Sequence, residues 1–353
     1  MAMADGAERD HWKKRRRRMR KRRLRKQRRR RQEIVAQERI GPVRRLRRYR
    51  AQNLPNPPAP FVIGMTRSGT TLMRLMLDSH PKLTIPPETH FIPDVIKAFN
   101  DGRDSPAEVA AVMTESRRWG DFEVSAEELE RELHRLRPLT HPEMAIRTFY
   151  RLYAKRQGKS RWGDKTPGYA TKIRRIKRTL PEASFIHMIR DGRDVALSLQ
   201  DRDAGLSTEQ IARRWRHRIN RTRRAAHDVP DYLEIRYEDL VADPEGTLRR
   251  ICEHIELDYS VRMLDYHERA TDRLRELAKP LAAEGEKRGL SAESRLEAHA
   301  MTAEPPRTDR SGRWRTEMPP ADLAVFEEHA GEVLVKLGYE RAPAAGAEIG
   351  TEG

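Results

Sequence analysis

Short runs of apolar residues alternate along the chain with segments in which apolar residues recur at helical spacing. The runs at residues 61–65, 184–189 and 232–236 are typical of strands that are buried on both faces of a sheet. Helices are predicted over residues 72–79, 173–180, 195–199, 211–226, 244–255 and 323–337. Strands that alternate with helices predict an α/β fold, in which helices flank both faces of a central parallel sheet.

Two longer segments have less regular patterns. Residues 92–160 are mainly helical in their spacing, and we expect them to form a helical cap over an edge of the sheet. Residues 268–310 are rich in charge and show little apolar periodicity. We therefore expect this stretch to be a loop that is mobile or that a partner orders.

The net positive charge of the chain is concentrated at its N-terminus. The 353 residues carry a formal net charge of +18, and residues 1–50, with 23 Lys or Arg and 5 Asp or Glu, account for all of it. From Lys13 to Arg31, 16 of 19 positions are Lys or Arg. Such dense like charge predicts a disordered tail. Its expected partners are an anionic surface or nucleic acid, and the alternative is a solubilising arm without a dedicated partner.

Proline marks the boundary between this tail and the folded part. Four prolines between residues 55 and 60 cannot continue a helix, so they predict an extended linker. The predicted organisation is a basic tail, a Pro-rich linker, a folded domain and a disordered C-terminal tail. These parts span residues 1–50, 51–60, 61–341 and 342–353, respectively.

Several classes of protein are disfavoured by composition. No run approaches the roughly 20 apolar residues of a membrane span, and no apolar segment of a signal peptide follows the N-terminal charges. The single cysteine, Cys252, excludes an intrachain disulfide and a zinc site built on cysteines, which fits a reducing compartment. We expect a cytoplasmic protein, with peripheral contact to a membrane surface as a further option.

The first predicted strand leads through a small polar loop, Gly64 to Thr71, into a helix. Backbone N–H groups in such a loop and at the start of a helix form a site suited to phosphate. The spacing matches the nucleotide-triphosphate loop G-x-x-x-x-G-K-[ST], but Thr70 stands where that motif has Lys. Arg67 supplies positive charge instead. An ordinary strand-to-helix turn is the alternative interpretation of the loop alone.

The stretch from Thr66 to Thr71 resembles the 5′-phosphosulfate loop of the sulfotransferases, which use 3′-phosphoadenosine 5′-phosphosulfate (PAPS) as sulfuryl donor. The family's second signature, R-D-x-R-D-x-x-x-S, matches Arg190 to Asp194 with Ser198, and in the family that pair binds the 3′-phosphate. The resemblance covers about residues 60–340. It implies the P-loop-like sulfotransferase fold, with both phosphate sites at the carboxyl edge of one sheet.

Further motifs are most similar to the branch of tyrosylprotein sulfotransferases and their bacterial relatives. They are Arg67 to Arg74, Leu77 to Pro81, Glu88-Thr89, Asp164 to Pro167, Arg236 to Val241 and Leu337 to Tyr339. Animal members of that branch are anchored luminal proteins with disulfides, and this chain has neither a span nor a cysteine pair. The acceptor hydroxyl therefore stays open between protein tyrosine, carbohydrate, lipid and small molecule. Because dimers are common in the branch, a homodimer is a further partner to expect.

The resemblance implies roles for individual residues. Glu88 is the implied general base, provided that burial raises its pKa toward the working pH, and His90 is its rival. Arg67 and Lys165 are the implied cations at the reacting group. The residues implied in nucleotide binding are Arg67, Ser68, Gly69, Thr70, Thr71, Arg190, Ser198, Tyr237 and Arg313.

No metal is expected, because the acidic residues form neither a D-x-D-x cluster nor an H-E-x-x-H helix. Two alternative functions stay open. One is a P-loop nucleotide kinase or another NTPase, which the change at Thr70 disfavours. The other is a protein that binds nucleic acid or an anionic surface through its basic tail.

Overall fold

The computed structural model describes residues 56–342, apart from 137, 202–204, 284–288 and 298. The predicted basic tail, the first half of the linker and all but the first residue of the C-terminal tail lie outside the described residues. Within the described part the chain divides into two compact units. One contains residues 91–115 and 125–148, and the other contains residues 57–90, 116–124 and 149–342.

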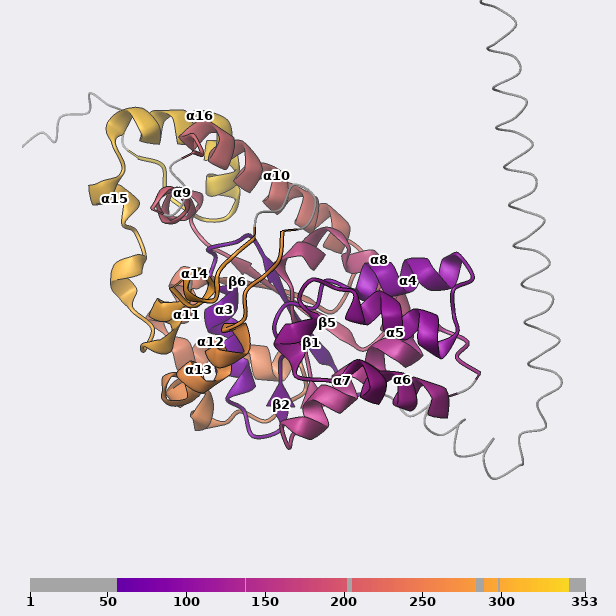
Figure 1. The fold of residues 1–353 in the computed structure, drawn as a ribbon. Helices are drawn as coiled ribbons and strands as arrows, with labels where there is room; N and C mark the ends of the chain where they lie inside the picture. Colours follow the sequence, from indigo (N-terminus) through magenta and orange to yellow (C-terminus); the bar gives the residue numbers. More distant parts are fainter. Residues whose placement is uncertain (1–55, 137, 202–204, 284–288, 298, 343–353) are drawn as a thin grey trace, which may run out of the picture. The chain divides into compact units, whose positions relative to one another are not determined.

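A four-stranded parallel sheet is the centre of the larger unit (Figure 1). Its strands are β1 (Ala59–Gly64), β4 (Asp164–Lys165), β5 (Ala183–Ile189) and β6 (Tyr232–Arg236), in the order β4-β1-β5-β6. Phe61 pairs with Asp164 on one side and with Phe185 on the other. Every residue of β1 and β5 is buried, which explains why both read as continuous apolar runs. The predicted α/β fold with a central parallel sheet is confirmed.

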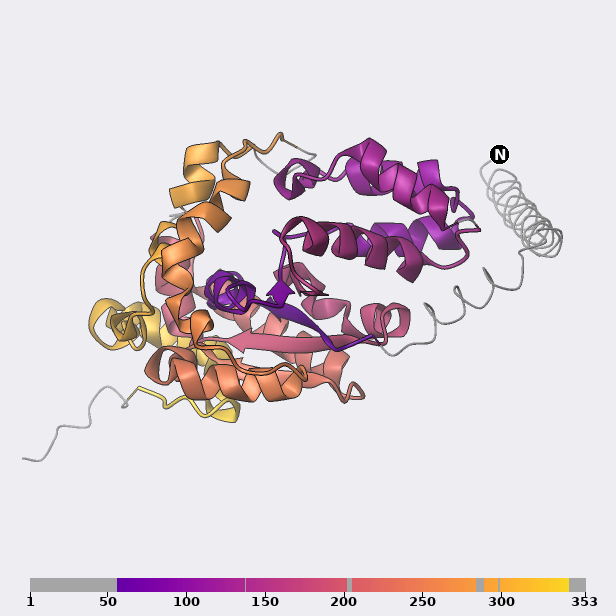
Figure 2. The ribbon, with the colours of Figure 1, turned by 90° about the horizontal axis from the view of Figure 1, so that it is seen from below.

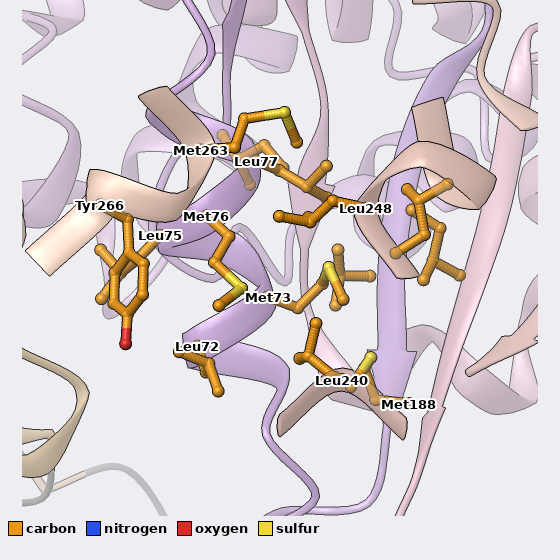
Figure 3. Close-up of a cluster of buried hydrophobic side chains, with 14 of the residues drawn as sticks. Leu72, Met73, Leu75, Met76, Leu77, Met188, Leu240, Leu248, Met263 and Tyr266 are labelled. Atoms are coloured by element: carbon orange, nitrogen blue, oxygen red, sulfur yellow. The ribbon is translucent and has the colours of Figure 1, made fainter. Parts of the chain in front are cut away.

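One face of this sheet packs against the helix that follows the first loop. That helix, α3 (Thr70–Asp78), places Leu72, Met73 and Met76 in a core cluster with Met188 of β5 (Figure 3). The same cluster takes side chains from α11 (Tyr237–Ala242), α12 (Pro244–His254), η3 (Val261–Tyr266) and α13 (His267–Leu274). The core therefore fixes the start of α3 at the carboxyl edge of the sheet.

Helices also cover the opposite face. They are η2 (Pro167–Thr171), α8 (Ile173–Thr179), α9 (Gly192–Gln200), α10 (Thr208–Ala226), α15 (Trp314–Glu317) and α16 (Pro320–Lys336). Trp215 of α10 and Phe326 of α16 lie at the centre of their cluster, with ring centroids 6.1 Å apart. Figure 2 shows β1 and β5 side by side between these layers. A second, two-stranded parallel sheet joins β2 (Leu83–Thr84) to β3 (Arg161–Trp162).

The smaller unit is helical. It contains α4 (Ile92–Asn100), α5 (Pro106–Thr114), α6 (Ala126–Arg135) and the first half of α7 (Pro142–Arg156). Ser105 and Glu108 form a capping box at the start of α5. The helical character predicted for residues 92–160 is confirmed, and their role as a cap on the sheet stays a prediction. No helix in the described ranges is long and apolar enough to cross a membrane.

The loop predicted for residues 268–310 is wrong for the described part of that segment. It contains most of α13, then η4 (Arg275–Leu277), α14 (Ala292–Glu297), η5 (Ala300–Ala303) and η6 (Thr308–Arg310). The apolar pattern of the sequence did not predict this structure, because buried pairs of charged residues hold the segment in place. Arg74 of α3 lies 2.7 Å from Glu276, and Asp121 lies 2.6 Å from Arg295. The predicted linker also extends too far, since Ala59 and Pro60 already belong to β1.

Candidate active site

The first loop joins β1 to α3 at the carboxyl edge of the sheet. Gly69 is the N-cap of α3 and has a φ of 82°, a left-handed conformation that glycine adopts without strain. A Cβ atom at this position would lie 2.6 Å from Cδ2 of Tyr237. Thr70 and Thr71 begin the helix, whose first turn has no acidic residue. The amides at this helix start therefore suit an anion.

The second predicted phosphate site lies directly beside the first. Nη1 of Arg190, the residue after β5, donates to the carbonyl oxygen of Arg67 at 3.0 Å, and its guanidinium lies 4.6 Å from the centre of the Tyr237 ring. Nε of Arg67 donates to Oγ of Ser198 on α9 at 2.9 Å. Arg67 and Ser198 are 131 residues apart in the sequence, yet the parallel strands β1 and β5 bring the segments that follow them to one edge of the sheet.

Residues of both predicted phosphate sites line one cavity of about 660 Å³. Its walls include Arg67, Gly69, Thr70, Thr71, Glu88, Arg190, Ser198, Tyr237, His299, Arg310 and Arg313. This volume lies in the range of pockets that hold small molecules. Nε of Arg190 is buried and, within the described part of the chain, makes no hydrogen bond. The cavity thus offers positive charge with unused donor capacity.

Glu88 and Lys165 form an ion pair at the wall of this cavity. Nζ of Lys165, at the end of β4, donates to Oε1 of Glu88 at 2.9 Å. The other carboxylate oxygen lies 2.9 Å from Nε2 of His90 and 3.5 Å from Nη2 of Arg118. Glu88 and His299 also line a smaller neighbouring cavity of about 140 Å³, whose walls include Lys165. The carboxylate of Glu88 therefore lies in the wall that the two cavities share.

The expected rise in the pKa of Glu88 is wrong for this structure. Burial raises the pKa of the carboxyl, but the charge of Lys165, the hydrogen bond from His90 and the charge of Arg118 outweigh it. They hold the pKa of Glu88 well below its ordinary value. His90, the rival base, is 45% exposed at its side chain and is absent from the walls of both cavities. His90 therefore contacts Glu88 and does not line either cavity.

A buried polar network lies behind the ion pair and joins the residues next to it. Oγ1 of Thr89 donates to Oδ2 of Asp164 at 2.8 Å, and the hydroxyl of Tyr150 donates to the same oxygen at 2.8 Å. Asp164 is 0% exposed, and burial raises its pKa to about 6. Since Thr89 follows Glu88 and Asp164 precedes Lys165, this network fixes the backbone on both sides of the pair.

Two other predicted residues, Arg313 and Ser68, differ in their access to the large cavity. Arg313 lines the large cavity, but its Nε donates to Glu317 at 2.9 Å, and its Nη1 lies 3.3 Å from Asp201. Its contact with the 3′-phosphate stays a prediction. Ser68 is buried and is absent from the walls of both cavities. Within the described residues, no group of three or more His, Cys, Asp or Glu is placed to hold a metal ion.

Sequence reasoning missed two residues of this site. Arg118, the residue before η1 (Trp119–Phe122), lies 3.5 Å from Glu88, in a region where no sequence motif points to function. His299 lines both cavities from the segment that was expected to be a loop. Burial, and then the positive charge of Lys165, lower the pKa of His299 to about 3, so its imidazole is neutral at physiological pH.

Comparison with known proteins identifies this arrangement. A model of the sulfotransferase family matches residues 58–261, which is more than half of the chain. The chain belongs to the sulfotransferase family. The two phosphate signatures therefore lie in the part that carries the family match, and the kinase or NTPase alternative is set aside.

Individual relatives agree with this membership. A Caenorhabditis briggsae protein is 29% identical over 217 residues, which cover 59% of this sulfotransferase and 69% of the relative. Protein-tyrosine sulfotransferase A of Caenorhabditis elegans is 27% identical over 242 residues, or 64% of this chain and 57% of that protein. Protein-tyrosine sulfotransferase of Drosophila melanogaster is 26% identical over 221 residues, or 60% and 40%. The matched region thus spans only part of these last two proteins.

The fold is also similar to a solved structure. The sulfotransferase domain from the curacin biosynthetic pathway superposes with a TM-score of 0.54 at 17% identity, covering 82% of this sulfotransferase and 100% of that domain. At this identity the likeness concerns the fold alone. It agrees with the central parallel sheet and the helices on both of its faces.

Proposed function

We propose that this sulfotransferase transfers the sulfuryl group of PAPS to the hydroxyl of a protein tyrosine, with Glu88 as general base. The single observation that carries the base assignment is the 2.9 Å pair of Glu88 and Lys165 in the wall shared by the two cavities. The acceptor class is supported by the names of the Caenorhabditis elegans and Drosophila relatives, which are protein-tyrosine sulfotransferases.

The donor site is assigned to the two adjacent anion sites. Residues 67–71 would hold the 5′-phosphate through main-chain amides, the hydroxyls of the two threonines and the charge of Arg67. Arg190 and Ser198 would hold the 3′-phosphate, and Tyr237 lies against the Arg190 guanidinium where it borders the nucleotide cavity. The glycine at the helix start and the unused donor on Arg190 both fit an anionic ligand at this edge.

The chemistry needs a base for the acceptor hydroxyl and positive charge for the leaving phosphate. When bound, the donor supplies an activated sulfuryl group. Glu88 would accept the proton of the attacking hydroxyl, while Lys165 and Arg67 would stabilise the charge that develops. Lys165 cannot neutralise Glu88 fully and serve the reacting group at the same time. As Lys165 engages the reacting group its pull on Glu88 weakens, and the pKa of the carboxyl rises toward the range of an effective base.

The test combines donor binding with transfer of labelled sulfate. We expect 3′,5′-adenosine bisphosphate to raise the melting temperature more than ATP does. Label from PAPS should reach a tyrosine peptide and not the same peptide with phenylalanine at that position. If the bisphosphate and ATP stabilise the protein equally, the donor assignment fails. If label reaches only sugars, lipids or small alcohols, the enzyme stands and the tyrosine acceptor fails.

The base is tested by Glu88→Gln, which keeps the shape of the side chain and removes its basicity. We expect donor binding to persist and turnover to fall by roughly 100- to 10,000-fold. Glu297→Gln is the matched control, because Glu297 is another carboxylate in the wall of the same cavity. Turnover that survives in Glu88→Gln and is lost in His299→Ala would move the role of base to His299.

A further inference from the structure

The outward faces of α8 and α10 form a concentrated positive surface. Nine side chains of α10 are exposed, and five of them are arginines: Arg213, Arg214, Arg216, Arg221 and Arg224. Glu209 is the one carboxylate among the nine. The buried side of the same helix carries its apolar residues, with Trp215 at the centre. The arginines therefore share one solvent-facing stripe.

Helix α8 extends this stripe. Lys172, at its N-cap, and Arg174 and Arg178 are exposed, and the segment 171–180 has no acidic residue. Nη2 of Arg174 donates to the carbonyl oxygen of Arg224 at 3.2 Å, so α8 and the end of α10 lie side by side (Figure 1). We call this surface the basic face. Its members are Lys172, Arg174, Arg178, Arg213, Arg214, Arg216, Arg221 and Arg224.

Few anions neutralise the basic face. Among the described residues, Glu209 lies 2.8 Å from Arg213, and Asp228 lies 2.8 Å from Arg174. The pKa of Arg218 is lowered, first by burial and then by the charge of Arg221 beside it. Beyond residue 50 the chain has equal numbers of basic and acidic residues. The fold thus brings two basic segments together on one face of a part of the chain whose overall charge is balanced.

The C-terminal ends of the two helices of the basic face lie at the edge of the sheet where the described chain begins. Helix α8 ends shortly before β5 begins, and α10 ends shortly before β6 begins. Both C-terminal ends therefore lie at the amino edge of the parallel strands. Residue 56, the first described residue, precedes β1 by three positions, so the chain enters the sheet from that edge. In the sequence, the 16 basic residues between Lys13 and Arg31 precede this point.

We propose that the basic face docks this protein on the surface of an anionic lipid bilayer. Arginine binds phosphate and carboxylate headgroups with paired hydrogen bonds, and each basic side chain near such a surface adds to the attraction. The exposed positions of α8 and α10 include no Phe, Tyr or Trp side chain on which bases would stack. The broad, planar and anionic surface of a bilayer therefore fits the basic face better than a nucleic acid does.

Docking would leave the active site accessible. The cavity lies at the carboxyl edge of the strands, whereas the C-terminal ends of α8 and α10 lie at the amino edge. The proposal is therefore independent of the assignment of Glu88 and of the acceptor. Binding of 3′,5′-adenosine bisphosphate is expected to be the same with and without the basic face.

The experiment compares two full-length variants that lose the same charge. Arg214, Arg221 and Arg224 are changed together to Gln on the basic face. The control changes Arg250, Arg262 and Arg269 to Gln, three exposed arginines of the elements on the opposite face of the sheet. Each protein is sedimented with vesicles of phosphatidylcholine alone and with vesicles of equal parts phosphatidylcholine and phosphatidylserine, at low and near-physiological salt. Stabilisation by 3′,5′-adenosine bisphosphate reports that all three proteins are folded.

We expect the unaltered protein to bind only the vesicles that contain phosphatidylserine, and to bind them less at higher salt. The basic-face variant should partition on the order of 100-fold more weakly, while the control variant stays close to the unaltered protein. Equal losses in the two variants would overturn the proposal, because the tail and net charge alone would then explain binding. Binding to DNA that depends on the basic face, without binding to vesicles, would overturn the choice of a lipid surface.

Discussion

The buried carboxyl of Asp164 is predicted to make folding stability depend on pH. Asp164 lies behind the ion pair of Glu88 and Lys165, is 0% exposed and receives hydrogen bonds from Thr89 and Tyr150 on one oxygen. Its other oxygen is buried and, within the described part of the chain, has no hydrogen-bond partner. Burial raises its pKa to about 6 from an ordinary value of 3.8. The folded state therefore prefers the protonated carboxyl.

The magnitude follows from proton linkage. Between the two pKa values the folded protein holds one proton more than the unfolded chain, so stability falls by about 1.4 kcal/mol for each pH unit. The contribution of Asp164 is full below pH 3.8 and is lost as the pH rises through about 6. The full contribution of Asp164 to the free energy of unfolding is about 3 kcal/mol, and about 2 kcal/mol of it is lost between pH 4.5 and 7.

Asp164→Asn isolates this contribution. The amide oxygen of asparagine can accept the hydrogen bonds from Thr89 and Tyr150, and the side chain no longer titrates. The free energy of unfolding is measured with urea and circular dichroism at about pH 4.5 and about pH 7. Relative to the variant, the unaltered protein should lose about 2 kcal/mol between the two conditions.

The control for this prediction is Asp258→Asn, because the side chain of Asp258 is 94% exposed and folding scarcely changes its hydration. Its difference from the unaltered protein should change little over the same range. A difference between the unaltered protein and Asp164→Asn that stays constant from pH 4.5 to 7, or that grows in favour of the unaltered protein, would refute the burial argument.

Two further predictions concern the reacting pair and the first loop. Lys165→Met removes the cation that lowers the pKa of Glu88 most, so the pKa of that carboxyl should rise. The acidic limb of the profile of kcat/KM against pH should then move to higher pH. An unmoved limb would contradict the pairing. Gly69→Ala should lower the free energy of unfolding by roughly 2 kcal/mol or more, because it adds backbone strain and drives Cβ to 2.6 Å from Tyr237. Gly158→Ala is its control in thermal unfolding, since Gly158 has a φ of 64° but open space around it. Equal losses in the two alanine variants would show that the contact with Tyr237 is unimportant.

The sequence alone determined the alternation of strands and helices, and it predicted the two phosphate sites. These features are local. A buried strand shows as an apolar run, and the loop from Gly64 to Thr71 lies between a strand and a helix whatever the rest of the chain does. Because parallel strands place their carboxyl ends at one edge, the same pattern also predicted that Arg67 and Arg190 would meet, and they do.

Only the tertiary structure decided the electrostatics of the site and the fate of the charged segments. Glu88 and Lys165 are 77 residues apart in sequence, and their pairing reversed the expected direction of the pKa of Glu88. Residues 268–310 pack through buried polar pairs and bring His299 to the cavity, and arginines from α8 and α10 meet on one surface. A pKa depends on burial and on the distance to every nearby charge. Such distances between remote parts of the chain exist only after folding.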